Sequence, residues 1–113
     1  SMGAVSALMS NKAKVMVVDS AFSSLKMVCL ETAKNNSPYV PNCLIDCLFP
    51  CVYSILRNDI EKKTGHNIDE LDVAKKVEQM STDYSLLFLT GEQDEMVHAS
   101  HSKLLYEKFR GNK

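Results

Sequence analysis

Two short apolar runs constrain the fold of this 113-residue chain more than any other feature. The first is KVMVV at 14–18, and the second is SLLFLT at 85–90. Short runs of consecutive apolar residues that end at a polar residue or a glycine, here Asp19 and Gly91, are typical of parallel strands covered on both faces. Helix-forming segments precede, separate and follow the two runs. The sequence therefore predicts an α/β protein with two parallel strands and right-handed crossovers.

The spacing of apolar residues elsewhere predicts helices. We expect them at 2–10, 24–34, 41–58, 72–79 and 101–110. Ser23 and Ser100 are the expected N-caps of the second and last helices. Pro50 is expected to kink or split helix 41–58 near Phe49, and 59–70 is expected to be a polar loop. Helix 41–58 is apolar nearly all round, which predicts a packed interior helix, a lid over a site or a partner-binding surface.

Composition and charge exclude several classes of partner. The formal net charge is -1 and the pI is about 6.3, so no electrostatic attraction to nucleic acid or an anionic membrane is expected. No apolar run reaches the roughly 18 residues of a membrane span. Two strands leave both sheet edges open, so we expect neighbouring strands from outside this chain, or a homo-oligomer formed through the edges or helix 41–58.

The four cysteines are Cys29, Cys43, Cys47 and Cys51. A spacing of four places the last three on one face of a helix, where their thiols cannot adopt disulfide geometry. No second cluster of Cys or His with ligand spacing is visible, so a redox or metal site is only an alternative interpretation. We interpret the cysteines as small buried apolar residues of a protein from a reducing, cytoplasmic compartment, and expect no cofactor or metal.

SMGAVSAL at 1–8 matches the second half of the nucleophile elbow G-x-S-x-G. In that motif a serine, here Ser1, lies on a tight turn before a helix, and a glycine, here Gly3, lets the backbone approach closely. The N–H of the next residue, Met2, would be an oxyanion-hole donor. Ser-Met also occurs as the remnant of an expression tag, so Ser1 has two possible origins.

GEQDEMV follows the second predicted strand. An acid beyond the carboxyl end of a parallel strand is placed to orient a histidine and to stabilise its imidazolium form. The spacing Gly-x-x-Asp selects Asp94 over its neighbours Glu92 and Glu95. The alternative interpretation of this segment is a solvated acidic loop.

Three stretches resemble the α/β-hydrolases in the right order: SMGAVSAL at 1–8, VVDSAFSSL at 17–25 and FLTGEQDEMVHASHSKLLYEKF at 88–109. The closest similarity is to the α/β-hydrolase-domain group that includes protein depalmitoylases and related esterase-like proteins. The resemblance implies an incomplete α/β-hydrolase domain over 1–113, with an elbow helix, cap-like helices at about 24–58, an acid loop and a following helix. It implies hydrolysis of an ester or thioester through an acyl-serine intermediate.

The same resemblance places the catalytic histidine beyond a further strand. His98 and His101 follow Asp94 by only a few residues, so we do not expect either to be the base, and His66 is expected to be solvated. The resemblance also implies core strands and a second oxyanion donor that this chain does not contain. We therefore expect a C-terminal piece of a serine hydrolase that is inactive by itself; the alternative is a non-catalytic module that self-associates.

Overall fold

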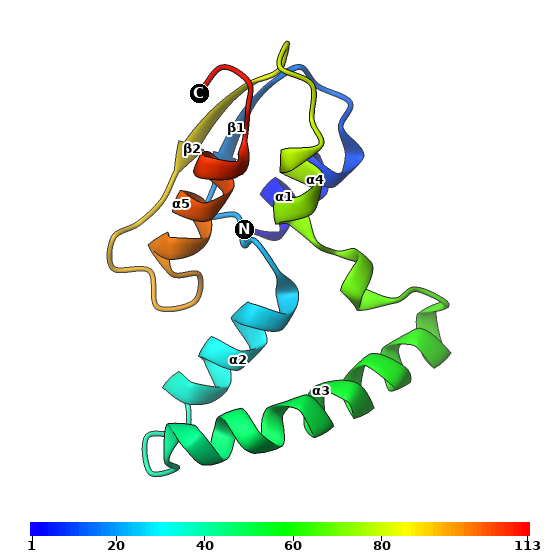
Figure 1. Cartoon of the computed structure of the whole chain (residues 1–113), viewed down its shortest axis with the longest axis vertical. Coiled ribbons are helices and arrows are strands. Elements are labelled where there is room, and N and C mark those ends of the chain that lie inside the picture. The colour runs from blue at the N-terminus through cyan, green and yellow to red at the C-terminus, as the bar shows by residue number, and fades with distance from the viewer. The chain divides into compact units, whose positions relative to one another are not determined.

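A computed structural model describes residues 1–113, which form two compact units. The first contains residues 1–24 and 72–113, and the second contains residues 25–71. The elements are α1 (Met2–Ser10), β1 (Val15–Asp19), α2 (Leu25–Asn35), α3 (Asn42–Thr64), the 3-10 helix η1 (Ile68–Glu70), α4 (Val73–Glu78), β2 (Ser85–Leu89) and α5 (Ala99–Lys108) (Figure 1). None of these helices combines the length and the hydropathy of a membrane-spanning segment.

The first unit is built on a two-stranded sheet. β1 and β2 pair in parallel along all five residues of each strand, with Val17 opposite Leu87 at the centre. This confirms the predicted mixed α/β class and the two parallel strands expected at 14–18 and 85–90. The first and last helices expected from the sequence, at 2–10 and 101–110, are also present as α1 and α5, although α5 begins two residues earlier.

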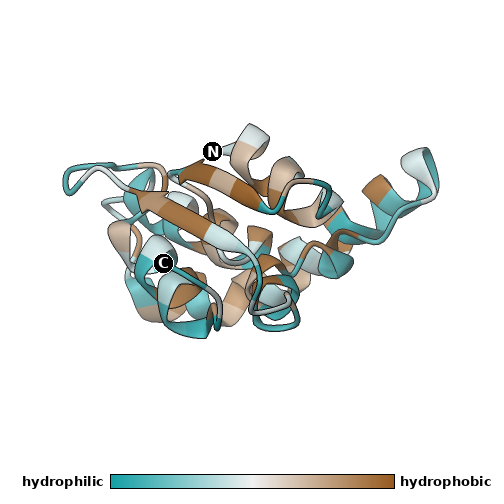
Figure 2. Cartoon of the chain, turned by 90° about the horizontal axis from the view of Figure 1, so that it is seen from above, coloured by the Kyte–Doolittle hydropathy of each residue, from teal (hydrophilic) through white to brown (hydrophobic).

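The two faces of the sheet differ in burial. Met16, Val18 and Leu86 are buried, so the helices that contact the strands cover this face. The opposite face exposes Val15, Val17, Leu87 and Leu89, with exposed fractions of 75%, 63%, 56% and 45%. Both strands are strongly hydrophobic (Figure 2). The expectation of burial on both faces is therefore wrong for this chain, because the covering elements lie on one side only.

The core of the first unit lies between the covered sheet face and helices α1, α4 and α5. Its most deeply buried apolar residues include Val5, Leu8, Val18, Val73, Val77, Leu105 and Phe109. The chain leaves this unit after Ser24 and returns at Asp72, and an antiparallel bridge joins these two residues. The backbone N–H of Ala74 also donates to the Ser23 carbonyl at 3.1 Å. The exit and the return of the chain are thus held side by side.

The outer edge of β2 carries a single parallel bridge, between Ser85 and Asn112. The N–H of Asn112 donates to the Tyr84 carbonyl at 3.0 Å, and its carbonyl accepts from Leu86 at 2.9 Å. Gly111 makes this approach possible, since a Cβ there would lie 2.5 Å from the Tyr84 carbonyl oxygen. The glycine is thus required by close contact with the backbone of a neighbouring segment.

We predict that Gly111→Ala destabilises the chain by about 1–3 kcal/mol, the usual cost of overpacking. The added methyl group would also lie 2.4 Å from Cζ of Phe109, which is buried. Gly3→Ala is the matched control, because a Cβ at Gly3 meets no atom within 4 Å. Chemical denaturation of both variants measures the difference, and equal destabilisation would contradict the contact described here.

The second unit consists of α2, α3 and η1, and its core is small. Tyr53 is the buried residue of α3, with an exposed fraction of 5%. Its hydroxyl donates to Asp69 Oδ1 at 2.9 Å, and Arg57 donates to the other oxygen of the same carboxylate at 3.0 Å. The Phe49 ring stacks on Tyr53 with centroids 5.6 Å apart. One aromatic residue of α3 and one carboxylate after it therefore connect α3 to η1.

Helix α3 differs from its prediction at both Pro50 and its C-terminus. It continues through Pro50 as one helix of 23 residues and ends at Thr64, within the stretch expected to be a loop. Residues 59–64 are polar except for Ile60, but Glu61, Lys62 and Lys63 favour helix, and an ion pair at 2.9 Å joins Asp59 to Lys63 one turn later. Gly65 ends the helix in the left-handed conformation, with φ of 73°.

Two further expectations for the second unit are wrong. Cys43, Cys47 and Cys51 are exposed rather than buried, and Cys29 is half-buried. Burial raises the pKa of the Cys29 thiol. Helix α2 occupies nearly the predicted range, but it contains no fully buried residue. The apolar stripes of both helices thus remain largely or partly accessible to solvent.

We predict that Tyr53 titrates well above the ordinary pKa of a tyrosine. Burial, followed by the hydrogen bond to Asp69, raises its pKa from 10.0 to about 12. The neutral phenol is favoured in the folded state, so this stabilisation is present below about pH 10 and is lost as the pH rises toward 12. Tyr53→Phe should cost about 1 kcal/mol at neutral pH. Ultraviolet titration tests this; an ordinary pKa for every tyrosine would contradict it.

Candidate functional site

The N-terminus of α1 carries two of the predicted site residues. Ser1 is the N-cap, and its carbonyl accepts from the N–H of Val5 at 3.0 Å. The Ser1 hydroxyl makes no capping hydrogen bond. Met2 is the first helical residue, so its N–H is one of the donors that an α-helix leaves without an internal partner. Gly3 has open space around it, so the close backbone approach expected there is absent in this chain.

Asp94 lies in the loop between β2 and α5, where the sequence predicted an acid. Its Oδ1 accepts two backbone hydrogen bonds, from the N–H groups of Met96 and Val97, each at 2.9 Å. Its own N–H donates to the Gly91 carbonyl at 3.3 Å. Val97 is buried, so the turn that Asp94 organises is fixed to the core. The carboxylate therefore has a defined position beyond the end of β2.

The charged form of Asp94 is stabilised from several directions. The hydrogen bonds from Val97 and Met96 lower the pKa of this carboxyl most, while desolvation opposes them. The Ser20 hydroxyl and the positive charge of the Ser1 amino group lower it further. Helix α1 contacts β1 and is joined to its start by residues 11–14 alone, so the helix and the strand run in opposite directions. Ser1 therefore lies toward the carboxyl end of the parallel sheet, the end that Asp94 follows. Figure 1 shows the N-terminus near the end of β1.

Ser20 is a residue of this edge that the sequence analysis did not select. It directly follows β1, and its N–H donates to the Leu89 carbonyl at 3.0 Å, which extends the ladder by one step. Its φ of 49° is unusual for a residue with a side chain. The hydroxyl lies 3.2 Å from Asp19 Oδ1. The available signal was its place directly after a predicted strand, where only Asp19 was singled out, as the polar residue that ends the strand.

Ser23 and His101 form a buried pair next to this edge. Each has an exposed fraction of 1%. Nδ1 of His101 lies 2.7 Å from the Ser23 hydroxyl and accepts the Ser23 N–H at 3.2 Å. Because Nδ1 accepts, the ring proton is assigned to Nε2. The pair joins the segment after β1 to the first turn of α5, so both ends of the loop containing Asp94 are anchored.

The expected roles of several neighbouring residues are corrected. Ser23 was predicted as a helix cap, but its hydroxyl bonds the buried imidazole, and α2 begins at Leu25. Ser100 is not the N-cap of the last helix, because α5 begins at Ala99 with His98 as its N-cap. Of the three histidines, His101 is buried and held by Ser23, whereas His98 and His66 are exposed.

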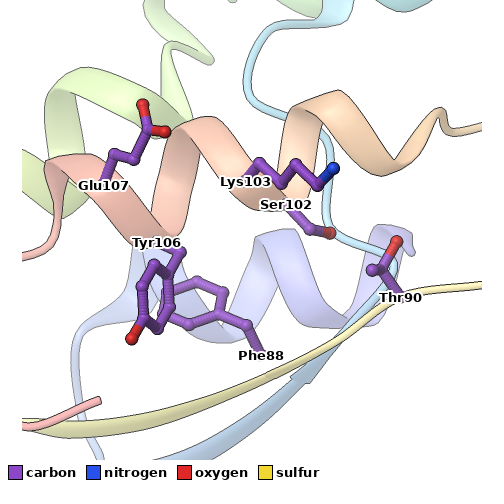
Figure 3. A pocket seen from close by; sticks show the side chains of 6 residues that line it. All are labelled: Phe88, Thr90, Ser102, Lys103, Tyr106 and Glu107. Carbon is purple, nitrogen blue, oxygen red and sulfur yellow. The ribbon is translucent and has the colours of Figure 1, made fainter.

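A shallow pocket of about 210 Å³ lies between β2 and α5. Its lining residues are Phe88, Thr90, Ser102, Lys103, Tyr106 and Glu107. The Phe88 and Tyr106 rings meet edge to face with centroids 5.9 Å apart, while Thr90, Ser102 and Lys103 lie toward the other end (Figure 3). The pocket is smaller than the roughly 300–1,000 Å³ of drug-sized ligand sites and contains none of the predicted site residues.

Comparison with protein-family models, with curated proteins and with solved structures found no match for this chain. No group of three or more His, Cys, Asp or Glu side chains is arranged to hold a metal ion. The site is therefore described by its own geometry: a serine at a helix N-terminus and a fixed carboxylate at the same edge of a parallel sheet.

We predict that Asp94→Ala accelerates hydrogen exchange at the amides of Met96 and Val97, because both lose their acceptor. The stabilisation that the carboxylate supplies is present above its ordinary pKa of 3.8 and is lost as the pH falls through the lowered value. The variant should therefore lose less stability on acidification than the parent chain. Glu92→Ala is the control, since Glu92 is an exposed acid of the same loop; identical behaviour of the two variants would refute the role of Asp94.

Proposed function

We propose that this chain is part of a serine hydrolase of the α/β-hydrolase class, acting on an ester or thioester through an acyl-serine intermediate. In this proposal Ser1 is the nucleophile, Met2 supplies an oxyanion-hole N–H, and Asp94 is the acid that orients a histidine. The observation that carries it is the position of Asp94 beyond the carboxyl end of a parallel strand, the end of the sheet toward which the N-terminus of α1 lies.

The geometry of α1 supports the roles of Ser1 and Met2. The N-terminus of a helix combines unpaired N–H donors with the positive end of the helix dipole, and both stabilise an oxyanion that develops beside them. The Ser1 side chain is exposed and makes no capping bond, so its hydroxyl is accessible to a substrate carbonyl. The same groups would also bind any small anion, so anion binding does not test the catalytic roles of Ser1 and Met2. A chemical reaction at the Ser1 hydroxyl does.

The uncovered sheet face supports membership of a larger α/β sheet. Parallel sheets are stable when both faces are covered, yet Val15, Val17 and Leu87 are more than half exposed. The bridge at Asn112 occupies the outer edge of β2 as a third parallel strand would. In this proposal β1 and β2 are inner strands of an α/β-hydrolase sheet, and the other strands and helices supply the missing cover.

We predict that a fluorophosphonate probe does not label Ser1 stoichiometrically in this chain. A serine hydroxyl needs a positioned base to become a nucleophile. His101 is buried against Ser23, and in this proposal the catalytic histidine belongs to a segment beyond a further strand. Intact mass spectrometry with peptide mapping measures the labelling. Stoichiometric labelling without an added base would overturn the predicted inactivity.

Added imidazole tests the nucleophile itself. With imidazole as a diffusible base, Ser1 should be labelled faster than Ser10, which lies at the other end of the same helix, where the dipole disfavours an oxyanion. Ser1→Ala should remove the imidazole-dependent labelling, and Ser10→Ala should keep it. Equal labelling of the two serines would argue against the proposed function.

A further inference from the structure

The pocket between β2 and α5 has two chemically different ends. One end is aromatic, where the rings of Phe88 and Tyr106 meet edge to face. The other end carries the Lys103 ammonium and the hydroxyls of Thr90 and Ser102, which lie near one another in Figure 3. An apolar wall that leads to a few convergent polar groups is the usual composition of a small-molecule site.

The polar groups of this end have no partner within the chain. The Ser102 side chain is 4% exposed, yet its hydroxyl makes no hydrogen bond, not even to the carbonyl one turn earlier that a helical serine can use. Lys103 makes no ion pair, although Glu107 follows it by one helical turn. A nearly buried hydroxyl without an acceptor is costly, so an acceptor from outside the chain would stabilise it.

The two ends together define the chemistry of a ligand. An ammonium and two hydroxyls can all donate, and a carboxylate, which only accepts, has enough oxygen lone pairs for three donors. The other end suits an aromatic ring, because aromatic pairs gain free energy beyond the area that they bury. The volume limits the size of this ligand. A cavity of roughly 150 Å³ holds benzene, so the 210 Å³ of this pocket leaves room for a ring and one carboxylate.

We propose that this pocket binds a small aryl carboxylate, with its carboxylate at the donor end and its ring at the aromatic end. Glu107 lines the pocket on the side of Tyr106, where its charge disfavours a second carboxylate (Figure 3). The nearby Lys113 ammonium already donates to the Tyr106 and Phe109 carbonyls, which leaves Lys103 as the cation for the ligand. This inference does not depend on the proposed hydrolase function, because the pocket contains none of the residues proposed for catalysis.

Titration of the full chain with benzoate, followed by amide chemical shifts, tests the binding. We expect saturable shifts at the amides of Thr90, Ser102 and Lys103, with a dissociation constant of roughly 1 mM, which suits a ligand of this size. Benzamide keeps the ring and loses the charge, whereas acetate keeps the charge and loses the ring. Each should bind about fivefold more weakly than benzoate, or weaker still.

Variants of the donor end test the orientation of the ligand. Ser102→Ala should weaken benzoate binding about tenfold, because a hydrogen bond to a charged acceptor is lost. It should not unfold the chain, since alanine favours helix. Lys103→Gln should weaken binding about fivefold and remove most of its dependence on salt. Lys12→Gln is the matched control, because it removes the same charge from an exposed lysine of the same unit.

Four results would overturn the inference. The first is the absence of saturable shifts at the pocket amides. The second is benzamide binding as tightly as benzoate, which would show that the pocket does not recognise charge. The third is shifts at Met2 and Gly3 in place of those at the pocket, which would assign the anion to the N-terminus of α1. The fourth is equal weakening by Lys12→Gln and Lys103→Gln, which would show only a general effect of net charge.

Discussion

Parallel pairing of β1 with β2 is the constraint on which the rest of the first unit depends. Parallel strands place their carboxyl ends at the same edge, so the segments that follow them emerge side by side. Asp94 follows β2, and Ser20 and Ser23 follow β1. Helix α1 packs against β1 with its N-terminus near this edge, which adds Ser1 to the group. Residues from the two ends of the sequence are thus brought to the same end of the sheet because two five-residue strands pair in one register.

Buried polar contacts fix this edge more closely than the sheet alone could. The pair of Ser23 and His101 connects the segment after β1 to α5, and the two backbone bonds to Asp94 shape the loop before α5. A buried polar group without a partner is costly, so each of these contacts favours a single conformation. The loop that contains the acid is therefore organised by the same residues that close the core.

The second unit is an insertion whose two ends are tied together. The chain leaves the first unit after Ser24 and returns to it at Asp72. The bridge between these two residues keeps the ends of the 47-residue insertion adjacent, so the insertion does not disturb the sheet. Closing a longer loop adds little entropic cost, so such an insertion is tolerated. Its own core is centred on Tyr53 and Asp69, and several apolar residues of α3, among them Leu48, Val52 and Ile55, remain exposed.

The sequence predicted those features that local pattern determines. Apolar runs gave both strands and their parallel arrangement, and the spacing after Gly91 selected Asp94. The polar composition of residues 59–64 led to the wrong prediction of a loop, because Glu and Lys favour helix although they are hydrophilic. The single-sided burial of the sheet and the exposure of the cysteines could not be predicted, since both depend on what packs against an element. The pairing of Ser23 with His101 is a contact across 78 positions and has no local signature.

The central claim is that the N-terminus of α1 and the loop containing Asp94 lie at one edge of the sheet. Carboxyl-detected nuclear magnetic resonance titration of Asp94, with the amino terminus free and then acetylated, tests it most directly. Acetylation removes the positive charge at Ser1, so the account predicts that the pKa of Asp94 rises. The pKa of Asp83, lowered to about 2 chiefly by Lys14, should stay unchanged as the internal control. An Asp94 pKa that does not respond to acetylation would contradict the account.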